Sequence, residues 1–220
     1  MCIRDSTNVD RIGGASRFTT SALIAAELPG SPTTAYVTEG SNADPARGWP
    51  DALSVSPLAA SSGTPILLVT RDVLPDDTAT ALTDLGITEV TVVGGEAAVS
   101  TTVDDAISAA GVTLTPRLSG PSRYATSVAV AEAAVDAGAH PGLVWFATGL
   151  NFPDALVAGP AVAVDGGVMM LVHGRDADRS PESIGWLDAH ADDPVERVRI
   201  LGGPGAVAAE VEAVINAKLA

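Results

Sequence analysis

The chain has 220 residues, of which 46% are apolar, and 27 acidic against 12 basic side chains give it a net charge of -15. This apolar share excludes a disordered chain, and no apolar run reaches the 18 or more residues that a membrane-spanning helix needs. The negative charge argues against nucleic acid and anionic lipid as partners, because both would be repelled. We therefore expect a folded protein with no membrane insertion and no nucleic-acid partner.

The first six residues differ from the rest of the chain. Met1–Ser6 matches nothing later in the sequence and contains the only cysteine, Cys2, so no internal disulfide can form. It also lacks the apolar segment of a secretory signal peptide. We expect residues 1–6 to be a non-native scar.

From residue 16 onward, helix and strand signals alternate. Ser16 is a candidate N-cap for a first helix, which Pro29 and Gly30 end. The strands are predicted from short and mostly unbroken apolar runs. The elements expected in the first half are a helix at 17–28, a strand at 34–38, a long polar loop at 39–50, a helix at 51–62, a strand at 65–69, a helix at 75–85, a strand at 90–93 and a helix at 97–110.

After a short linker at 111–116, the same series returns. The elements expected in the second half are helices at 123–137, 154–164, 181–190 and 206–219, alternating with strands at 143–147, 168–172 and 198–201. Unbroken apolar strands that alternate with helices are typical of a parallel sheet covered by helices on both faces. The predicted fold class is therefore α/β, in three layers.

A short motif occurs twice and divides the chain. It reads R-I-G-G-A-S-R-F at 11–18 and R-L-S-G-P-S-R-Y at 117–124, 106 residues later. Further landmarks recur in the same order after each copy, namely a glycine (Gly40, Gly149), a P-D-A-L segment (50–53, 153–156), a proline (Pro57, Pro160) and a glycine pair (94–95, 202–203). Such an ordered series indicates a duplicated unit. We expect two tandem units at 7–113 and 114–220, and the loop at 39–50 is six residues longer than its counterpart.

The sequence contains none of the common catalytic motifs: no G-x-S-x-G, no P-loop, no H-E-x-x-H and no cysteine pair. The three histidines, His140, His173 and His190, lie in the second half without counterparts, and we expect them on the solvated surface. Each glycine pair follows a strand and precedes a helix, where backbone amides can hold a phosphate, although a tight turn explains the pair more simply. We expect no catalytic residue, no metal and no cofactor.

Two arginines lie at equivalent positions near a helix start. Arg17 and Arg123 both stand where the helix dipole disfavours a cation, so a compensating negative charge is expected. One candidate is a carboxylate of the same unit, Asp51 or Asp154, which would otherwise serve as a helix N-cap. The other is an external anion, for which an arginine beside a helix N-terminus is a good receptor. Both alternatives remain open from the sequence.

The duplicated pattern resembles the cell-wall-binding repeat type 2 family. That pattern reads R-x-x-G-x-x-R-[YF]-x-T, then a strand, an N-F-P-D-A-L-like segment, P-I-L-L, and a strand ending in G-G. It begins at Arg11 in the first unit and at Arg117 in the second, where Asn151 opens the N-F-P-D-A-L segment. The second unit departs from the family in reading V-M-M-L where P-I-L-L is usual.

The resemblance implies a non-catalytic module that anchors surface and S-layer-associated proteins to anionic polymers of a bacterial wall, such as teichoic acid. The expected location is extracellular, at the cell wall or cell surface. The polymer-binding residues that we expect are Arg11, Arg17, Asp51, Arg117, Arg123, Asn151 and Asp154. Members usually carry three repeats about a pseudo-threefold axis, so a chain with two is expected to self-associate or to pack with a third repeat.

The alternative function is that of a cell-wall hydrolase, amidase-like or peptidase-like, or of part of one whose activity lies in an absent domain. An enzyme needs one asymmetric cluster of polar residues, whereas the polar landmarks of this sequence are duplicated. Duplication favours binding, because two linked weak sites raise the apparent affinity through effective concentration.

Overall fold

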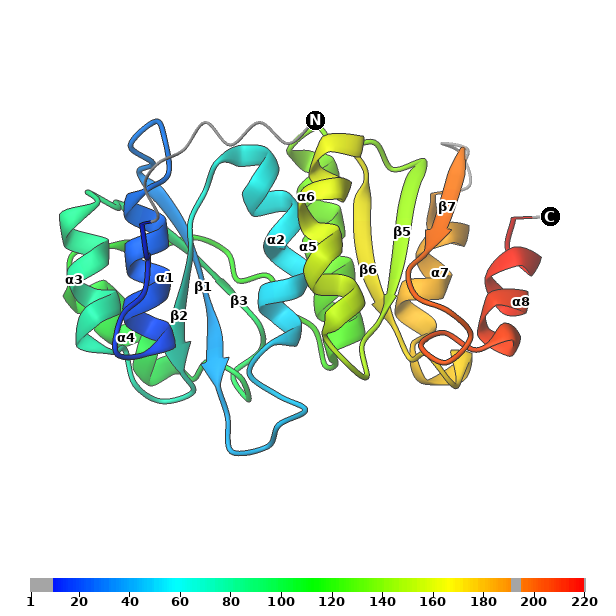
Figure 1. The fold of residues 1–220 in the computed structure, drawn as a ribbon, viewed down its shortest axis with the longest axis horizontal. Coiled ribbons are helices and arrows are strands. Elements are labelled where there is room, and N and C mark those ends of the chain that lie inside the picture. Colours follow the sequence, from blue (N-terminus) through cyan, green and yellow to red (C-terminus); the bar gives the residue numbers. More distant parts are fainter. Residues whose placement is uncertain (1–9, 191–194, 220) are drawn as a thin grey trace.

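The structure is a computed structural model that describes residues 10–190 and 195–219. The segment at 1–6, expected to be a scar, lies outside the described residues. The described chain forms two α/β units, one after the other along the long axis of the molecule (Figure 1).

The first unit is built on a four-stranded parallel sheet with the strand order β2-β1-β3-β4. Its elements are α1 (Arg17–Ala26), β1 (Thr34–Ser41), α2 (Pro50–Ser62), β2 (Ile66–Thr70), α3 (Asp76–Asp84), β3 (Glu89–Val93), α4 (Thr101–Ala109) and β4 (Thr113–Leu114). Helices α1, α3 and α4 cover one face of the sheet, and α2 covers the other (Figure 1).

The second unit repeats this plan on a parallel sheet with the order β6-β5-β7. Its elements are α5 (Arg123–Asp136), β5 (Leu143–Thr148), α6 (Pro153–Asp165), β6 (Val168–Val172), the 3-10 turn η1 (Ala177–Arg179), α7 (Pro181–Ala189), β7 (Arg197–Ile200) and α8 (Ala209–Ala217). The predicted fold class is confirmed: both units are α/β with parallel sheets and helices on their faces.

Two helices begin later than predicted. Helix α4 starts at Thr101 rather than near residue 97, and α8 starts at Ala209 rather than near 206. The reason is a tight turn after each glycine pair, in which the Val99 amide donates to the Gly95 carbonyl over 3.0 Å and the Val207 amide to Gly203 over 3.1 Å. The turn is repeated in both units, so the local sequence specifies it.

The linker predicted at 111–116 is instead part of the first sheet. Thr113 and Leu114 form β4, which pairs in parallel with β3, and Leu118 makes a further bridge to Val93. The predicted boundary between residues 113 and 114 therefore falls within a strand. This segment leads covalently into the second motif while its hydrogen bonds belong to the first unit.

Helix α2 is buried between the two units (Figure 1). Val55 and Leu58 of α2 belong to a hydrophobic cluster that also contains Phe146 and Met170 of the second sheet. Burial of such side chains removes apolar surface from water and stabilises the contact by roughly 1.5–3 kcal/mol for each fully buried residue. The two units therefore share a hydrophobic cluster at their junction, and the first unit has a further cluster of its own that includes Val37 and Leu67.

Candidate functional site

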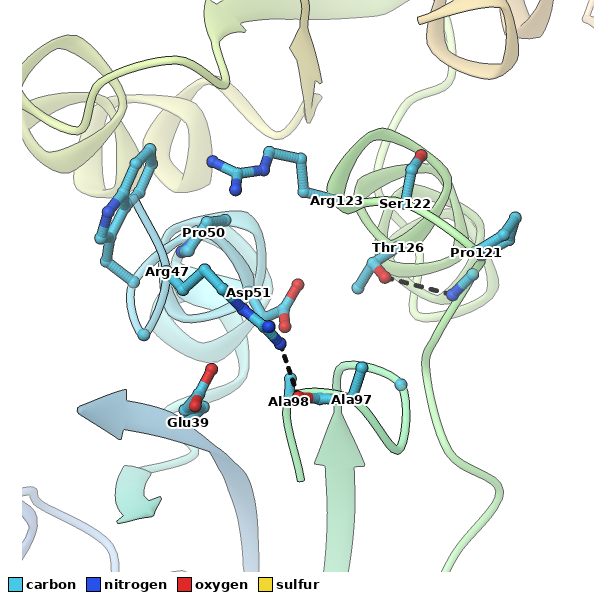
Figure 2. A pocket seen from close by; sticks show the side chains of 14 residues that line it. Glu39, Arg47, Pro50, Asp51, Ala97, Ala98, Pro121, Ser122, Arg123 and Thr126 are labelled. Carbon is cyan, nitrogen blue, oxygen red and sulfur yellow. Dashed lines mark hydrogen bonds between the residues drawn. The ribbon is translucent and has the colours of Figure 1, made fainter. Parts of the chain in front are cut away.

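A pocket of about 160 Å³ lies at the junction of the two units. The first unit contributes the carboxyl ends of β1 and β3 and the start of α2, and the second contributes the start of α5 (Figure 2). In the first sheet β1 lies between β2 and β3, so the chain leaves it in opposite directions on its two sides. Crevices at such a switch point are the usual ligand sites of open parallel sheets.

Arg123 spans the junction from the second unit to the first. Its Nη1 donates to the Gly149 carbonyl over 2.7 Å and its Nη2 to the Ala46 carbonyl over 2.9 Å. Its guanidinium also lies over the Trp49 ring, 5.3 Å from the ring centroid, an arrangement that attracts a cation to an aromatic face. The loop that the sequence showed to be enlarged therefore binds the arginine of the following unit.

Arg47 of the same loop is a second cation of the pocket. Its Nη2 donates to the Ala97 carbonyl over 2.5 Å, which fixes the loop beside the turn after β3 (Figure 2). A guanidinium has five N–H donors, so both Arg47 and Arg123 retain donors for an anion. These two cations come from different units and line one pocket.

Two carboxylates lie deeper in the same pocket. Glu39 is only 3% exposed and accepts a hydrogen bond from the Asn42 amide group over 2.7 Å. Burial raises the pKa of the Asp51 carboxyl to about 6; the nearby Glu39 also raises it, while Arg123 and Arg47 act to lower it. The pocket therefore combines hydrogen-bond acceptors at its base with guanidinium donors on its walls.

Two helices begin at the pocket. Helix α5 has Ser122 as its N-cap, whose hydroxyl accepts from the Ala125 amide, and α2 begins with Pro50 and has no side-chain cap. Their N-termini carry partial positive charge, which favours a bound anion. Ser16 caps α1 in the same way as Ser122 caps α5, which confirms the predicted cap.

The predicted N-caps Asp51 and Asp154 are wrong. Both lie in the first helical turn, after the caps Trp49 and Phe152, which make no side-chain cap bond. Each carboxylate instead reaches toward the glycine pair of its own unit. A Cβ atom built on Gly94 would lie 2.4 Å from Asp51 Oδ2, and one on Gly202 would lie 2.6 Å from Asp154 Oδ2. Both residues also have a positive φ, 108° and 93°, which favours glycine.

Of the two alternatives left open for each arginine, the pairing with the aspartate of its own unit is not found among the described residues. Within residues 10–190 and 195–219, no hydrogen bond or ion pair joins Arg17 to Asp51 or Arg123 to Asp154. Arg17 Nη1 donates instead to the Gly40 carbonyl over 2.6 Å, the bond equivalent to that from Arg123 to Gly149. The duplicated arginine therefore closes the end of the first strand in each unit.

Arg117 faces away from the pocket, into the first unit. Its guanidinium makes a bidentate ion pair with Asp104 at 2.6 and 2.7 Å, and also donates to the Gly94 and Val99 carbonyls. Arg11 and Asn151 are exposed, and the Asn151 side chain accepts from the Phe152 amide. Of the seven predicted residues, only Arg123 and Asp51 line the junction pocket.

Sequence reasoning missed Glu39, Arg47 and Trp49. The enlarged loop was the available signal, since it is the largest departure between the two copies of the pattern. The histidines also differ from expectation: His173 is 7% exposed beside the Tyr124 ring, and His190 stacks on Trp186 with 3.7 Å between the centroids. Only His140 keeps an exposed side chain, as predicted for all three.

Neither a membrane span nor a metal cluster is found in the part of the chain that the structure describes. None of the helices there combines the length and apolar character required to cross a bilayer. The same residues hold no group of three or more His, Cys, Asp or Glu side chains placed to bind a metal ion.

Comparison with known proteins assigns the two units to one family. A family model described as "Cell wall binding domain 2" matches residues 11–104 and 117–212, one match in each unit. The chain belongs to the cell wall binding domain 2 family. The resemblance seen in the sequence is thereby confirmed, and the two units are cell-wall-binding repeats of this family.

The curated relatives of this chain are longer proteins. It is 28% identical over 200 residues to the N-acetylmuramoyl-L-alanine amidase LytC of Bacillus subtilis (strain 168), covering 91% of this chain and 37% of the amidase. It is also 28% identical over 173 residues to the amidase enhancer of the same organism, covering 79% of this chain and 22% of that protein. The chain thus spans little more than a third of the first relative and less than a quarter of the second.

Two solved structures share the fold of the two repeats. Cwp6 from Clostridium difficile superposes with a TM-score of 0.78 at 23% identity, covering 94% of this chain and 31% of Cwp6. Cwp8 from the same organism superposes with a TM-score of 0.74 at 24% identity, covering 94% of this chain and 33% of Cwp8. At this identity the likeness concerns the fold.

Proposed function

We propose that the junction pocket holds a segment of an anionic cell-wall glycopolymer and that the chain thereby anchors a surface protein, outside the cell, to a bacterial wall. The observation that carries this proposal is the convergence of Arg47 and Arg123, from different units, with the N-termini of α2 and α5 in one pocket. A protein with a net charge of -15 can bind a polyanion only where cations are fixed locally. The pocket supplies such a place.

The carboxylates favour a glycopolymer over a simple polyphosphate. Glu39 and Asp51 are acceptors, so they repel phosphate oxygens but accept hydrogen bonds from sugar hydroxyl groups. Trp49, at the edge of the pocket, offers a flat apolar surface for a sugar ring. We therefore place phosphate or carboxylate groups of the polymer at the two arginines and a sugar unit above the carboxylates.

We assign the chain a non-catalytic role. The alternative of a cell-wall hydrolase draws on the amidase relative, but the aligned part is only 37% of that protein and falls on the repeats matched by the family model. Binding requires no reacting group, and the acceptors and donors of the junction pocket suffice for it. Any hydrolase activity in a longer protein is assigned to a further domain.

We also propose that a third repeat or a second copy packs on the outer face of α6. Leu156 and Val157 of α6 are 55% and 75% exposed, whereas Leu53 and Ser54, their equivalents on α2, are 6% and 1% exposed. The α2 residues are covered by the following unit, so the α6 residues are suited to the same kind of cover.

A pull-down on purified walls tests the proposed function. Walls before and after acid extraction of their anionic polymers are incubated with the parent chain and with Arg47→Gln and Arg123→Gln variants. We expect extraction to abolish binding by the parent chain, and each variant to bind untreated walls several-fold more weakly, since charge-assisted hydrogen bonds are among the strong ones.

The matched control is Arg175→Gln, because Arg175 is exposed and has no part in the pocket. It should bind as the parent does. Undiminished binding to extracted walls, or equal binding by all four proteins that stay folded by circular dichroism, would contradict the proposal.

A further inference from the structure

A groove of about 360 Å³ lies at the C-terminal end of the molecule, between β7 and α8. Strand β7 is the edge of the second sheet in the described chain, with β5 on one side and no described strand on the other (Figure 1). An edge strand presents unpaired N–H and C=O groups that can template a further strand. Val198, Ile200 and Leu219 add apolar side chains to the groove.

The first unit shows how the corresponding edge is covered. There β3 is the counterpart of β7, and residues 113–118 lie along it. The Thr115 amide donates to Val90 over 2.9 Å, the Leu118 amide donates to Val92 over 3.0 Å, and the Leu118 carbonyl accepts from Gly94 over 2.9 Å. An extended segment thus satisfies the whole edge.

That segment is fixed by an arginine. The Arg117 guanidinium meets three acceptors beyond the strand end: the Asp104 carboxylate of α4, the Gly94 carbonyl at 2.8 Å and the Val99 carbonyl at 3.1 Å. Its side chain is only 19% exposed, so the ion pair is largely withdrawn from water. The extended segment and its arginine therefore bind to the first unit together.

The second unit has the same receptor. Gly202, Val207 and Glu212 lie 108 residues after the three acceptors of Arg117, at the same positions of the turn and helix. All three line the groove. Glutamate differs from aspartate by one methylene and keeps the carboxylate that a guanidinium binds bidentately.

The side chains of β3, whose edge is covered by residues 113–118, are more deeply buried than those of β7, whose edge is open. Val90 and Val92 of β3 are buried, whereas their counterparts Val198 and Ile200 of β7 are partly exposed. Among residues 10–190 and 195–219, Glu212 has no ion-pair partner, and nothing hydrogen-bonds to the Gly202 amide. Among the described residues, the β7 edge is therefore open where the equivalent β3 edge is covered.

We propose that this groove binds an extended peptide segment of the type Thr-Leu-Thr-Pro-Arg-Leu, which adds a parallel strand to β7 and places its arginine on Glu212. The occupant follows from the first unit, where residues 113–118 have this sequence and fill the equivalent groove. Main-chain hydrogen bonds give such strand addition its affinity, and side-chain pockets give its specificity. This inference does not depend on polymer binding.

The test uses a peptide with the sequence of residues 112–119 and the full isotope-labelled chain, with amide chemical shifts as the readout. We expect the peptide to shift the amides of 197–202. Glu212→Gln should weaken binding by about tenfold or more, because a charge-assisted bidentate pair is lost. The matched control, Glu210→Gln, changes an exposed glutamate of the same helix that does not line the groove, and should bind as the parent does.

A second measurement keeps the proposal testable if the free peptide binds weakly. The same Thr-Leu-Thr-Pro-Arg-Leu segment is appended after residue 220, where its effective concentration is high. The extension should raise Tm, and an Arg→Gln change within it should remove the gain. An extension without effect on Tm, or equal peptide binding by the parent and Glu212→Gln, would overturn the proposal.

Discussion

Arg117 and Arg123 stand in one short motif, and their guanidinium groups face different partners. Arg117 is held by Asp104 and two backbone carbonyls of the first unit, so its contribution is to the contact between units. Arg123 bonds two carbonyls and still faces a pocket that also contains Arg47. The acceptors around a guanidinium, which come from distant parts of the chain, decide whether it is structural or available for a ligand.

The raised pKa of a single residue, Asp51, predicts that binding depends on pH. Burial raises this pKa to about 6, so the carboxyl is neutral below that pH and charged above it. Polyanion binding should therefore strengthen as the pH falls through about 6, because a negative charge leaves the pocket. The measurement is wall binding across this range, at constant ionic strength because salt screens such contacts.

The control for this pH profile is Asp51→Asn, which should flatten it and bind at high pH as the parent does at low pH. The same carboxyl also affects stability. Because folding raises its pKa from 3.8 to about 6, the folded state becomes less stable as the pH rises between these two values. If wall binding by the parent chain strengthens as the pH rises, or does not change with pH, the role given to Asp51 is contradicted.

At the scale of elements, the close crossing of α2 and α6 joins the units. A Cβ atom on Gly159 of α6 would lie 2.4 Å from Ser56 Oγ and 3.1 Å from Ser56 Cβ on α2. Gly159→Val should push the helices apart and lower the free energy of unfolding by roughly 1–3 kcal/mol, the usual cost of overpacking a core. Urea denaturation measures this change.

Gly185→Val is the matched control for that substitution. Gly185 is also helical, in α7, and a Cβ atom there meets nothing within 4 Å. Its unfolding midpoint should stay near that of the parent chain. If both variants lose the same stability, the crossing of α2 and α6 is not the cause.

The sequence predicted the regular elements well because their signals are local. Unbroken apolar runs such as that at 168–172 specify buried parallel strands, and the glycine pairs specify the turns after β3 and β7. Strand β4 was missed, because its two residues are held by β3 and carry no pattern of their own. The pocket was missed for the same reason: Arg47 and Glu39 acquire their role only when α5 of the other unit is packed beside them.

For the whole molecule, the exposed face of α6 predicts association. Leu156 and Val157 are 55% and 75% exposed, whereas their counterparts on α2, Leu53 and Ser54, are buried. We expect the parent chain to self-associate at high concentration, and Val157→Glu to weaken this, because a charge opposes burial of the face. Sedimentation velocity over a concentration series is the measurement, and a parent chain that stays monomeric throughout would count against this expectation.

We propose that the polymer site is formed once, where the two units meet, and not once in each unit. Arg17 and Arg123 make the same bond to a strand-end carbonyl, but only Arg123 faces a junction pocket. The most direct test is therefore to measure the affinity of Arg17→Gln and Arg123→Gln variants, both verified as folded, for purified walls over a salt series. We expect Arg123→Gln to weaken binding several-fold and to reduce its salt dependence, since fewer counterions are released, while Arg17→Gln should bind nearly as the parent chain does. Equal losses in the two variants would contradict it, because they would show that each repeat binds the polymer by itself.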